Sequence, residues 1–499
     1  MVGLNASLYT GLAGVRTAQV GLNVIGNNIA NVNTPFYSRQ MAETKVTGLG
    51  SGGRNIVGSG SEVSSILGLR DTIADQMLTR EQGRFGYHDT FAQGLAEVEG
   101  LMAETEFSGI GQRMSDFFGA IEEVSLRPSS TAARNELLAM GDRLATEIRN
   151  RDADLFQVQT RTNVDVESTV ARINQITAEI EALSGQIYNQ GTPPQDIIDE
   201  RYRKINELAE LVEVDVFDMG NNRIQVNIKD SNLVLVGEKQ YLLSVSQNAA
   251  NNNFFDVNID NGSGPTDITA QINGGTLGAK LDLRDNEIGD LRRRLDNLAA
   301  GLINQFNALH TTGFSLAAPP NDTGLRFFDP LDPTNPGAPA PPTVDPDRYQ
   351  GAASAISLST DLLVDPLDPS LGFDPDKVSL SDTAGETGNN VIALALAGLR
   401  DSSTVIDGNG DGTANTGTFE SYYGDTLSDL GRTTRNARDN LESHQLLLNQ
   451  AQARRDEVSG VNLDEEAIQL TQFQQAFQAS SRFIGVINQL TADILNRLG

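Results

Sequence analysis

Residues 1–35 read MVGLNASLYTGLAGVRTAQVGLNVIGNNIANVNTP and contain a single charged side chain, that of Arg16. Apolar and small residues recur in this stretch at steps of three and four, at Leu4, Leu8, Gly11, Val15, Ala18, Leu22, Ile25 and Ile29. This is the seven-residue spacing of a coiled-coil seam, and it predicts an amphipathic helix over 1–32. Pro35 predicts the end of that helix, because proline cannot continue the backbone hydrogen-bond ladder.

The other end of the chain carries a matching pattern. The same spacing recurs at Leu470, Phe473, Phe477, Ser480, Ile484, Ile487, Thr491, Ile494 and Leu498. Away from these seams, the polar side chains of both helices are mainly those of Asn, Gln, Ser and Thr. A neutral polar face can pack on another protein without desolvating charge. We therefore predict that the two terminal helices pair and become fully ordered when subunits assemble. The alternative is an ordinary helical hairpin within one chain.

The interior alternates between helical and extended patterns. Residues 38–63 are rich in Gly and Ser and predict an irregular or short β connection. A period of two begins at Val212 and predicts a small β domain, whereas 314–385 contains Pro-rich segments and is predicted to be irregular. Helical periodicity predicts further helices over 64–105, 110–126, 131–189, 195–212, 276–311, 388–400 and 420–458.

The predicted fold class is mainly α with an inserted all-β domain. The helical segments before and after the β insertion share a character, which suggests an elongated, nested multi-domain chain with paired terminal coiled-coil helices. The predicted regions are a terminal helical domain (1–63 plus 459–499), a helical rod domain (64–212, 276–313 and 386–458), the β domain (213–275) and an outer Pro/Gly-rich region (314–385).

Composition narrows the function. The 499 residues have a formal net charge of −29, from 66 acidic and 37 basic residues. Such a chain is repelled by nucleic acid and by anionic membranes, so neither is an expected partner. No Cys is present, which excludes disulfides and thiolate chemistry. No cleaved signal peptide and no apolar run long enough to span a membrane are recognised, so membrane insertion is not expected.

No motif in the sequence supports catalysis. His88, His310 and His444 are far apart and have no ligand-like neighbours at helical spacing, so we expect no enzyme activity, no cofactor and no metal site. The acidic turn at 407–412 opens like an EF-hand loop, which would make Asp407, Asn409 and Asp411 calcium ligands. However, Thr418 occupies the position that needs a bidentate carboxylate, so a simple turn is the favoured interpretation.

Several sequence blocks resemble bacterial flagellar proteins. Residues 27–40, NNIANVNTPFYSRQ, are similar to the N-terminal signature of flagellar rod, hook and hook-associated subunits, and the YSRQ ending is most similar to the hook-associated proteins. Residues 459–466 (SGVNLDEE) and 470–482 (LTQFQQAFQASSR) resemble the C-terminal signature of that family. The blocks GGTLG (274–278) and LRD (283–285) also look like segments of it. Phe36 departs from the Gly usual there, and predicts a type I turn or an extended exit instead of a type II turn.

The resemblance implies a structural subunit at the hook–filament junction next to the hook. Subunits would form a helical ring or tube whose inner layer is the paired terminal helices. Implied partners are further copies of the chain, the hook protein, the second junction protein, a cytoplasmic export chaperone on the C-terminal helix and the type III export apparatus. The implied location is the extracellular flagellum, after export without a cleaved signal. Alternatives are another axial subunit (the second junction protein or the hook protein) and, far less favoured, a secreted effector or surface enzyme.

The seams and signatures together define a predicted assembly interface. Its residues are Leu4, Leu8, Val15, Leu22, Ile25, Asn28, Ile29, Asn31, Thr34, Pro35, Tyr37, Leu470, Phe473, Phe477, Ile484, Ile487, Ile494 and Leu498.

Overall fold

The computed structural model describes residues 2–47, 60–104, 109–188, 193–262, 264–317, 322–330, 350–402, 404–406 and 415–498. The chain divides into two compact units, each assembled from separate stretches of sequence. The first unit contains 1–88, 167–278 and 441–499, and the second contains 89–166 and 279–440. The architecture is mainly helical with smaller β-sheets, as predicted. In the described residues no helix is both long and apolar enough to cross a membrane.

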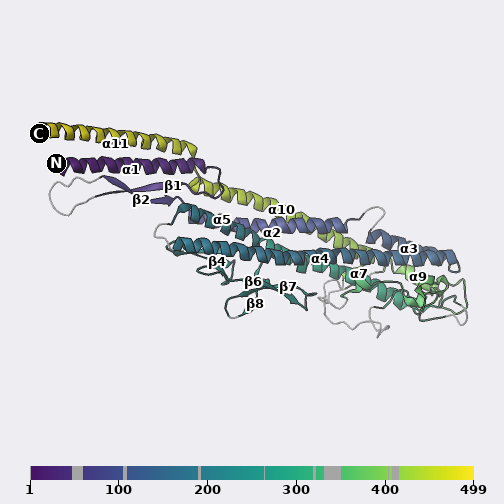
Figure 1. Cartoon of the computed structure of the whole chain (residues 1–499). Helices are drawn as coiled ribbons and strands as arrows, with labels where there is room; N and C mark the ends of the chain where they lie inside the picture. The colour runs from purple at the N-terminus through teal and green to yellow at the C-terminus, as the bar shows by residue number, and fades with distance from the viewer. Residues whose placement is uncertain are drawn as a thin grey trace. The chain divides into compact units, whose positions relative to one another are not determined.

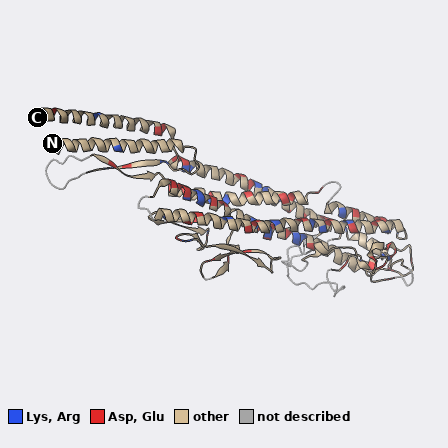
Figure 2. Cartoon of the chain, in the orientation of Figure 1, with Lys and Arg blue, Asp and Glu red and all other residues tan. Residues whose placement is uncertain are grey.

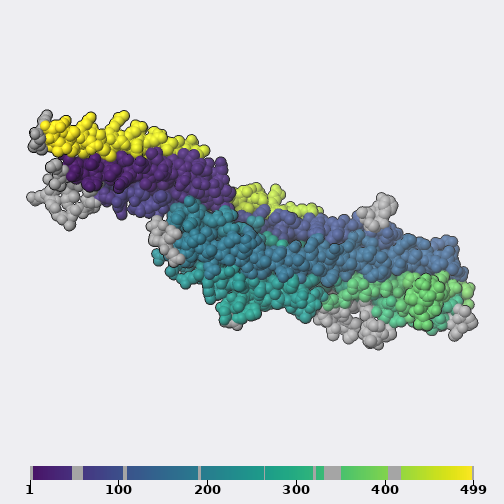
Figure 3. Space-filling model, viewed as in Figure 1, coloured from purple at the N-terminus to yellow at the C-terminus, as the bar shows by residue number. Residues whose placement is uncertain are grey.

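The first unit begins and ends with paired helices. α1 (Val2–Ala30) and α11 (Leu463–Leu498) pack along their length (Figures 1 and 3), which confirms the predicted pairing of the two ends. A β-hairpin of β1 (Gln40–Val46) and β2 (Ser61–Gly68) also contacts α1. Its strands are antiparallel, with a bulge between Glu43 and Thr44.

The remaining strands of the first unit form short antiparallel sheets. In the described residues, β3 (Val214–Gly220), β4 (Arg223–Ile228) and β5 (Val234–Val236) make one sheet in that order. A second sheet contains β6 (Leu243–Asn248), β7 (Phe254–Asp260) and β8 (Pro265–Asp267). Asn pairs with positive φ make the tight turns between β3 and β4 and between β6 and β7, because Asn tolerates this conformation: Asn221, Asn222, Asn252 and Asn253.

Long helices complete the architecture. α5 (Gln195–Leu211) lies in the first unit. Among the described elements, four helices contribute residues to both units: α2 (Thr72–Met102), α4 (Thr131–Tyr188), α6 (Gly275–Asp282) and α10 (Phe419–Ser459). The helix α6 continues through a π-helical turn (Leu283–Glu287) into α7 (Ile288–His310). Shorter elements are α3 (Ile110–Leu126), α8 (Ala352–Ala355), α9 (Val391–Gly398), β9 (Thr404–Ile406), β10 (Asn415–Gly417) and short 3₁₀ turns at Thr269–Gln271, Thr360–Leu362, Pro369–Leu371 and Pro375–Lys377.

An aromatic cluster forms the core of the second unit. Phe117 of α3 and Phe306 of α7 pack on Phe327 and Phe328, with ring centroids 4.6–6.0 Å apart. His310 is fully buried beside them and accepts the backbone N–H of Ser379 at Nε2. Burial lowers the pKa of His310 to about 4, so its ring is neutral at pH 7. Histidine here is a structural residue.

One boundary differs from the sequence-based prediction. The helix expected from residue 64 begins only at Thr72, because 61–68 form strand β2 paired with β1. Asp71 fixes the true start, since its Oδ1 accepts the backbone N–H groups of Ile73 and Ala74 as a helix N-cap. Ile73 and Met77, which fit the apolar helical period, are 68% and 43% exposed.

Candidate functional site

The contact between α1 and α11 depends on glycines in α1. A Cβ atom added to Gly11 would lie 2.7 Å from the Ile484 side chain, and one on Gly21 would lie 2.5 Å from the Phe473 ring. Large side chains of α11 therefore fill spaces that only glycine leaves open. Lower numbers on α1 meet higher numbers on α11, so the two helices run antiparallel.

The predicted interface residues lie mostly along this contact. Ile25 and Ile487 are buried, and Ile29 and Ile494 are more open, each 37% exposed. Thr34 and Pro35 are exposed in the turn after α1, whereas Asn31 is half-buried and accepts a hydrogen bond from Thr34. The side chain of Leu498 lies outside the described residues. The remaining seam residues are half-buried: Leu4, Leu8, Val15, Leu22, Leu470, Phe473, Phe477 and Ile484.

At one end of this helix pair, Asn28 holds three segments together. Its side chain is 1% exposed, and Nδ2 donates to the Gln40 carbonyl (2.9 Å) and to Glu466 Oε2 (3.1 Å). Its Oδ1 accepts the Tyr37 hydroxyl (3.0 Å) and the Gln40 backbone N–H (2.9 Å). All four hydrogen-bonding positions of the amide are used, which is the full capacity of an asparagine. We call this region the joint: Asn28, Tyr37, Ser38, Arg39, Gln40, Arg455 and Glu466.

The ion pair between Arg39 and Glu466 lies at the centre of the joint. Glu466 is fully buried and accepts Arg39 Nε at 2.7 Å, while the neighbouring Glu465, 54% exposed, also pairs with Arg39. The Arg39 backbone N–H donates to the Ser459 carbonyl at 2.8 Å. Asn462 caps α11, because its Oδ1 accepts the Asp464 N–H. These contacts connect the segment after α1 to the start of α11.

One residue in the turn between α1 and β1, Phe36, has a left-handed backbone conformation. Phe36 has φ 64°, and the Tyr37 N–H donates to the Thr34 carbonyl at 3.2 Å, so Pro35 and Phe36 occupy the central positions of a type II arrangement. The expectation of a type I turn or extended exit at Phe36 was therefore wrong. Arg455 of α10 explains why: its Nη2 donates to the Phe36 and Tyr37 carbonyls at 2.6 and 3.0 Å. These contacts hold the strained backbone in place.

The joint also connects to α5 and α2. The Ser38 N–H donates to Asp199 (3.0 Å), and Gln40 Nε2 donates to Asp196 (2.9 Å). Arg70 joins Asp199 to Asp75 through bonds of 3.1 and 3.0 Å. Burial, followed by the charges of the nearby carboxylates, raises the pKa of Tyr37, so its hydroxyl remains a donor at neutral pH. Burial also raises the pKa of Asp199.

Sequence reasoning found one half of the joint and missed the other. It selected Asn28 and Tyr37, but it did not select Arg455, which donates to the Tyr37 carbonyl, or Asp199 and Arg70, which connect the joint to α5 and α2. The only available signal for Arg455 was an arginine in a predicted amphipathic helix, which many exposed residues share.

The histidines give a second long-range contact that the sequence did not reveal. The rings of His88 and His444 stack with centroids 4.3 Å apart, and His444 Nδ1 lies 3.4 Å from Glu81. Burial and the proximity of His444 lower the pKa of His88 to about 4. Within the described residues no cluster of His, Asp and Glu suits a metal ion. The calcium candidates Asp407, Asn409 and Asp411 lie outside those residues.

Charge is distributed unevenly in the first unit. α1 and α11 carry few charged side chains along their length, and acidic residues occupy the first turn of α11 beside the joint (Figure 2). The pair therefore presents a surface of amides, hydroxyls and apolar groups. This arrangement suits protein–protein packing, and it contains no group of residues arranged for catalysis in the part of the chain that the structure describes.

Comparisons with known families match the two ends separately. Residues 8–37 match the family of flagella basal body rod proteins, and 452–498 match the C-terminal family of the flagellar basal body rod proteins FlgE, FlgF and FlgG. A segment is also 37% identical over 87 residues to the basal-body rod protein FlgG of Bacillus subtilis, covering 16% of this chain and 33% of that protein. Both end matches contain joint residues, so the joint lies in the parts of the chain that are similar to flagellar basal body rod proteins.

The interior of the chain is similar to one particular group of flagellar proteins. Residues 95–328 match the helical domain of flagellar hook-associated protein FlgK. Flagellar hook-associated protein 1 of Bacillus subtilis is 24% identical over 99% of both chains, and that of Salmonella typhimurium is 24% identical over 97% of this chain and 98% of the relative. The solved FlgK structure from Burkholderia pseudomallei shares the fold, with TM-score 0.63 and 16% identity over 77% of this chain and 100% of the other. Over nearly its whole length the chain is similar to flagellar hook-associated protein 1 (FlgK).

Proposed function

We propose that this chain is a structural subunit of the bacterial flagellum that forms the hook–filament junction next to the hook. The joint carries this proposal. It uses the signature residues of both chain ends to hold the α1–α11 pair, and the same end families occur in other flagellar axial proteins. The chain also matches relatives named for the hook-associated position along nearly its whole length. Subunits at this place would adapt the hook to the filament.

Further copies of the chain are the first proposed partners. Besides the seam, α11 carries a second apolar stripe, with Phe483, Val486 and Leu490 each 42–52% exposed. On α1, Tyr9 is 69% exposed. Neighbouring subunits in a ring or tube would cover these side chains. By the resemblance to flagellar proteins, the α1–α11 pair would form the inner layer of that assembly. The predicted seam residues support this layer by holding the pair together.

The other proposed partners rest on the similarity to flagellar hook-associated proteins. The hook protein and the second junction protein would contact the ring from its two sides. Before export, a cytoplasmic chaperone would cover the apolar stripe of α11, and the unfolded chain would pass through the type III export apparatus to the extracellular flagellum. The uncharged faces of α1 and α11 suit a channel wall, since a passing unfolded chain would meet few fixed charges.

The test is complementation of a strain of the source bacterium that lacks the chain. The proposal expects hooks without filaments, and flagellin in the medium, by electron microscopy and analysis of the culture supernatant. Wild-type chain and Asn27→Ala, a change at an exposed neighbour of the joint, should restore filaments, whereas Asn28→Ala should not. Normal filaments in the deletion strain would refute a junction function.

A further inference from the structure

A cavity of about 450 Å³ lies in the first unit, where β2, α5 and the β3–β4 hairpin meet. This volume is within the range of ligand-binding pockets. Two guanidinium groups, those of Arg70 and Arg201, line it together with the acidic residue Asp218. The other lining residues are polar or apolar, and none of them is charged.

Arg201 is the unusual residue of this cavity. It is 2% exposed, and its Nη1 donates to the Asn222 carbonyl at 2.8 Å. Among the described residues its Nε has no hydrogen-bond partner, and no carboxylate forms an ion pair with it. Burial lowers the pKa of Arg201, while Tyr202, Tyr188 and Asp218 act in the opposite direction. Buried guanidinium groups are normally paired, because removing an unpaired charge from water is costly.

The second guanidinium already has its partners. Arg70 pairs with Asp75 and Asp199, and it stacks on the Tyr202 ring at 3.6 Å. Arg201 is therefore the group that lacks a counter-charge. The nearby Asp218 acts on Arg201 only as a distant charge, and its position on the cavity wall favours a ligand with a single negative charge over a dianion.

We propose that this cavity binds a carboxylate group with Arg201 as the principal donor, and that the carboxylate belongs to an Asp or Glu side chain of a second copy of the chain. A guanidinium matches a carboxylate through two parallel N–H···O bonds. The second copy rests on the proposed function, in which subunits pack against one another. The chain has 66 acidic residues against 37 basic ones, so carboxylates are the charged groups that a neighbouring copy presents most often.

Filling the cavity would also strengthen the joint. The cavity walls belong to β2 and α5, and the joint already connects the β1–β2 hairpin to α5 through Gln40–Asp196 and Ser38–Asp199. A side chain held between these walls would restrict movement of the hairpin relative to α5. Assembly and the orientation of the hairpin would then be coupled through Arg201.

Binding is tested on the full-length chain with acetate as the probe. The arginine Nε–H signals are followed by NMR during titration with sodium acetate, sodium phosphate or sodium chloride at constant ionic strength. The Arg201 signal, assigned through Arg201→Lys, should shift saturably with acetate and much less with the other two salts. Asp218→Asn should tighten acetate binding severalfold, because it removes the like charge from the wall.

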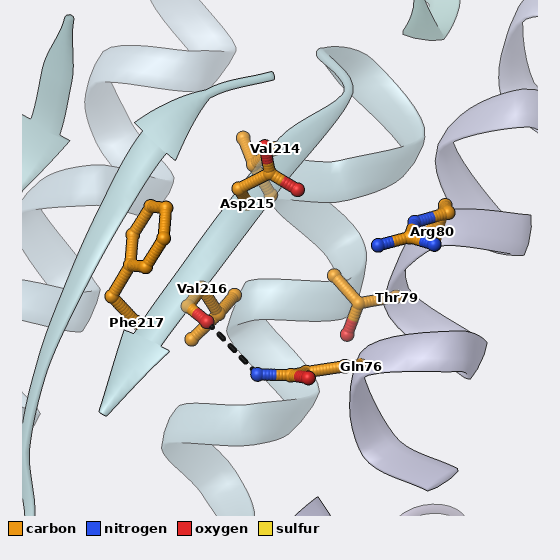
Figure 4. Close-up of a pocket in the computed structure, with 7 residues that line it drawn as sticks. All are labelled: Gln76, Thr79, Arg80, Val214, Asp215, Val216 and Phe217. Atoms are coloured by element: carbon orange, nitrogen blue, oxygen red, sulfur yellow. Dashed lines mark hydrogen bonds between the residues drawn. The ribbon is translucent and has the colours of Figure 1, made fainter. Parts of the chain in front are cut away.

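Two variants separate a binding role from a purely structural one. Arg201→Met should weaken acetate binding by roughly tenfold or more while the free chain stays folded by circular dichroism. The control is Arg80→Met, because Arg80 is exposed at a smaller neighbouring pocket between α2 and β3 (Figure 4), and it should leave acetate binding unchanged. Because the Arg201 signal is absent from both variants, their acetate binding is followed through the Nε–H signal of Arg70, which lines the same cavity. If Arg201→Met does not fold, weaker acetate binding by Arg201→Lys decides the question. An unresponsive Arg201 signal, or one that responds equally to chloride, overturns the proposal.

A final arm identifies the source of the carboxylate. Self-association of the full chain is measured by sedimentation velocity, with acetate replacing chloride at constant ionic strength. The proposal expects acetate and Arg201→Met each to weaken self-association, and Arg80→Met to leave it unchanged. Acetate binding without any effect on self-association overturns the second copy as the source. These measurements do not depend on flagellar position, so they distinguish failure of this inference from failure of the proposed junction function.

Discussion

Two adjacent glutamates allow a sharp test of the joint. Glu465 and Glu466 both form ion pairs with Arg39, but Glu465 is 54% exposed and Glu466 is fully buried. Glu466→Ala removes the acceptor of Arg39 Nε and also of Asn28 Nδ2, leaving a buried amide donor unpaired. Breaking a buried ion pair costs 3–5 kcal/mol, and because Arg39 keeps Glu465 we expect about 3 kcal/mol. Glu465→Ala should cost less than about 1 kcal/mol, because exposed pairs contribute little.

Amide hydrogen exchange is the appropriate assay, because the loss should be local to the joint. A change of about 3 kcal/mol corresponds to roughly 10²-fold faster opening, seen at the first turns of α11 and in β1. Exchange in the aromatic core of the second unit should stay unchanged. The reasoning would be refuted if both substitutions accelerated exchange equally, or if Glu466→Ala left these amides as protected as in the wild type.

Three further outcomes follow from single positions. Gly21→Ala should destabilise the α1–α11 pair by about 1–3 kcal/mol in urea unfolding, because its methyl group would meet the Phe473 ring. Gly26→Ala has open space and should stabilise α1 by about 0.5–1 kcal/mol. Equal effects of the two substitutions would contradict this packing. Phe36→Val should lower the stability by about 1–2 kcal/mol, whereas Phe36→Asn should be tolerated, because of these two residues only Asn accepts a positive φ readily. If thermal unfolding showed the Val variant to be more stable than the Asn variant, that result would count against the turn. The pKa of His88 in the folded chain is lowered to about 4, below the value of 6.5 for an unperturbed histidine. The contribution of His88 to stability is therefore full above pH 6.5 and is lost as the pH falls toward 4. NMR titration of the ring should give a midpoint near 4, and a midpoint near 6.5 would show that the ring is hydrated.

Local patterns predicted most helices because each depends on nearby residues. The long helix expected over 131–189 is α4 (Thr131–Tyr188), and the final helix is α11 (Leu463–Leu498). Residues 64–68 of strand β2 were wrongly assigned to a helix, because the pairing of β2 with β1 is a contact between distant residues that local periodicity does not record. Phe36 was misjudged for a related reason: local preference disfavours its φ, and Arg455, over four hundred positions away, overrides that preference.

The sequence by itself determined that the two ends of the chain are helices with matching seams, that the body is acidic and mainly helical, and that the end signatures are those of flagellar proteins. These properties are contained in periodicity, composition and short motifs. Only the tertiary structure decided what the signatures do. It brings Asn28, Arg39, Arg455 and Glu466 into one buried joint and leaves Arg201 without a counter-charge, because hydrogen bonding and burial depend on which distant segments meet in space.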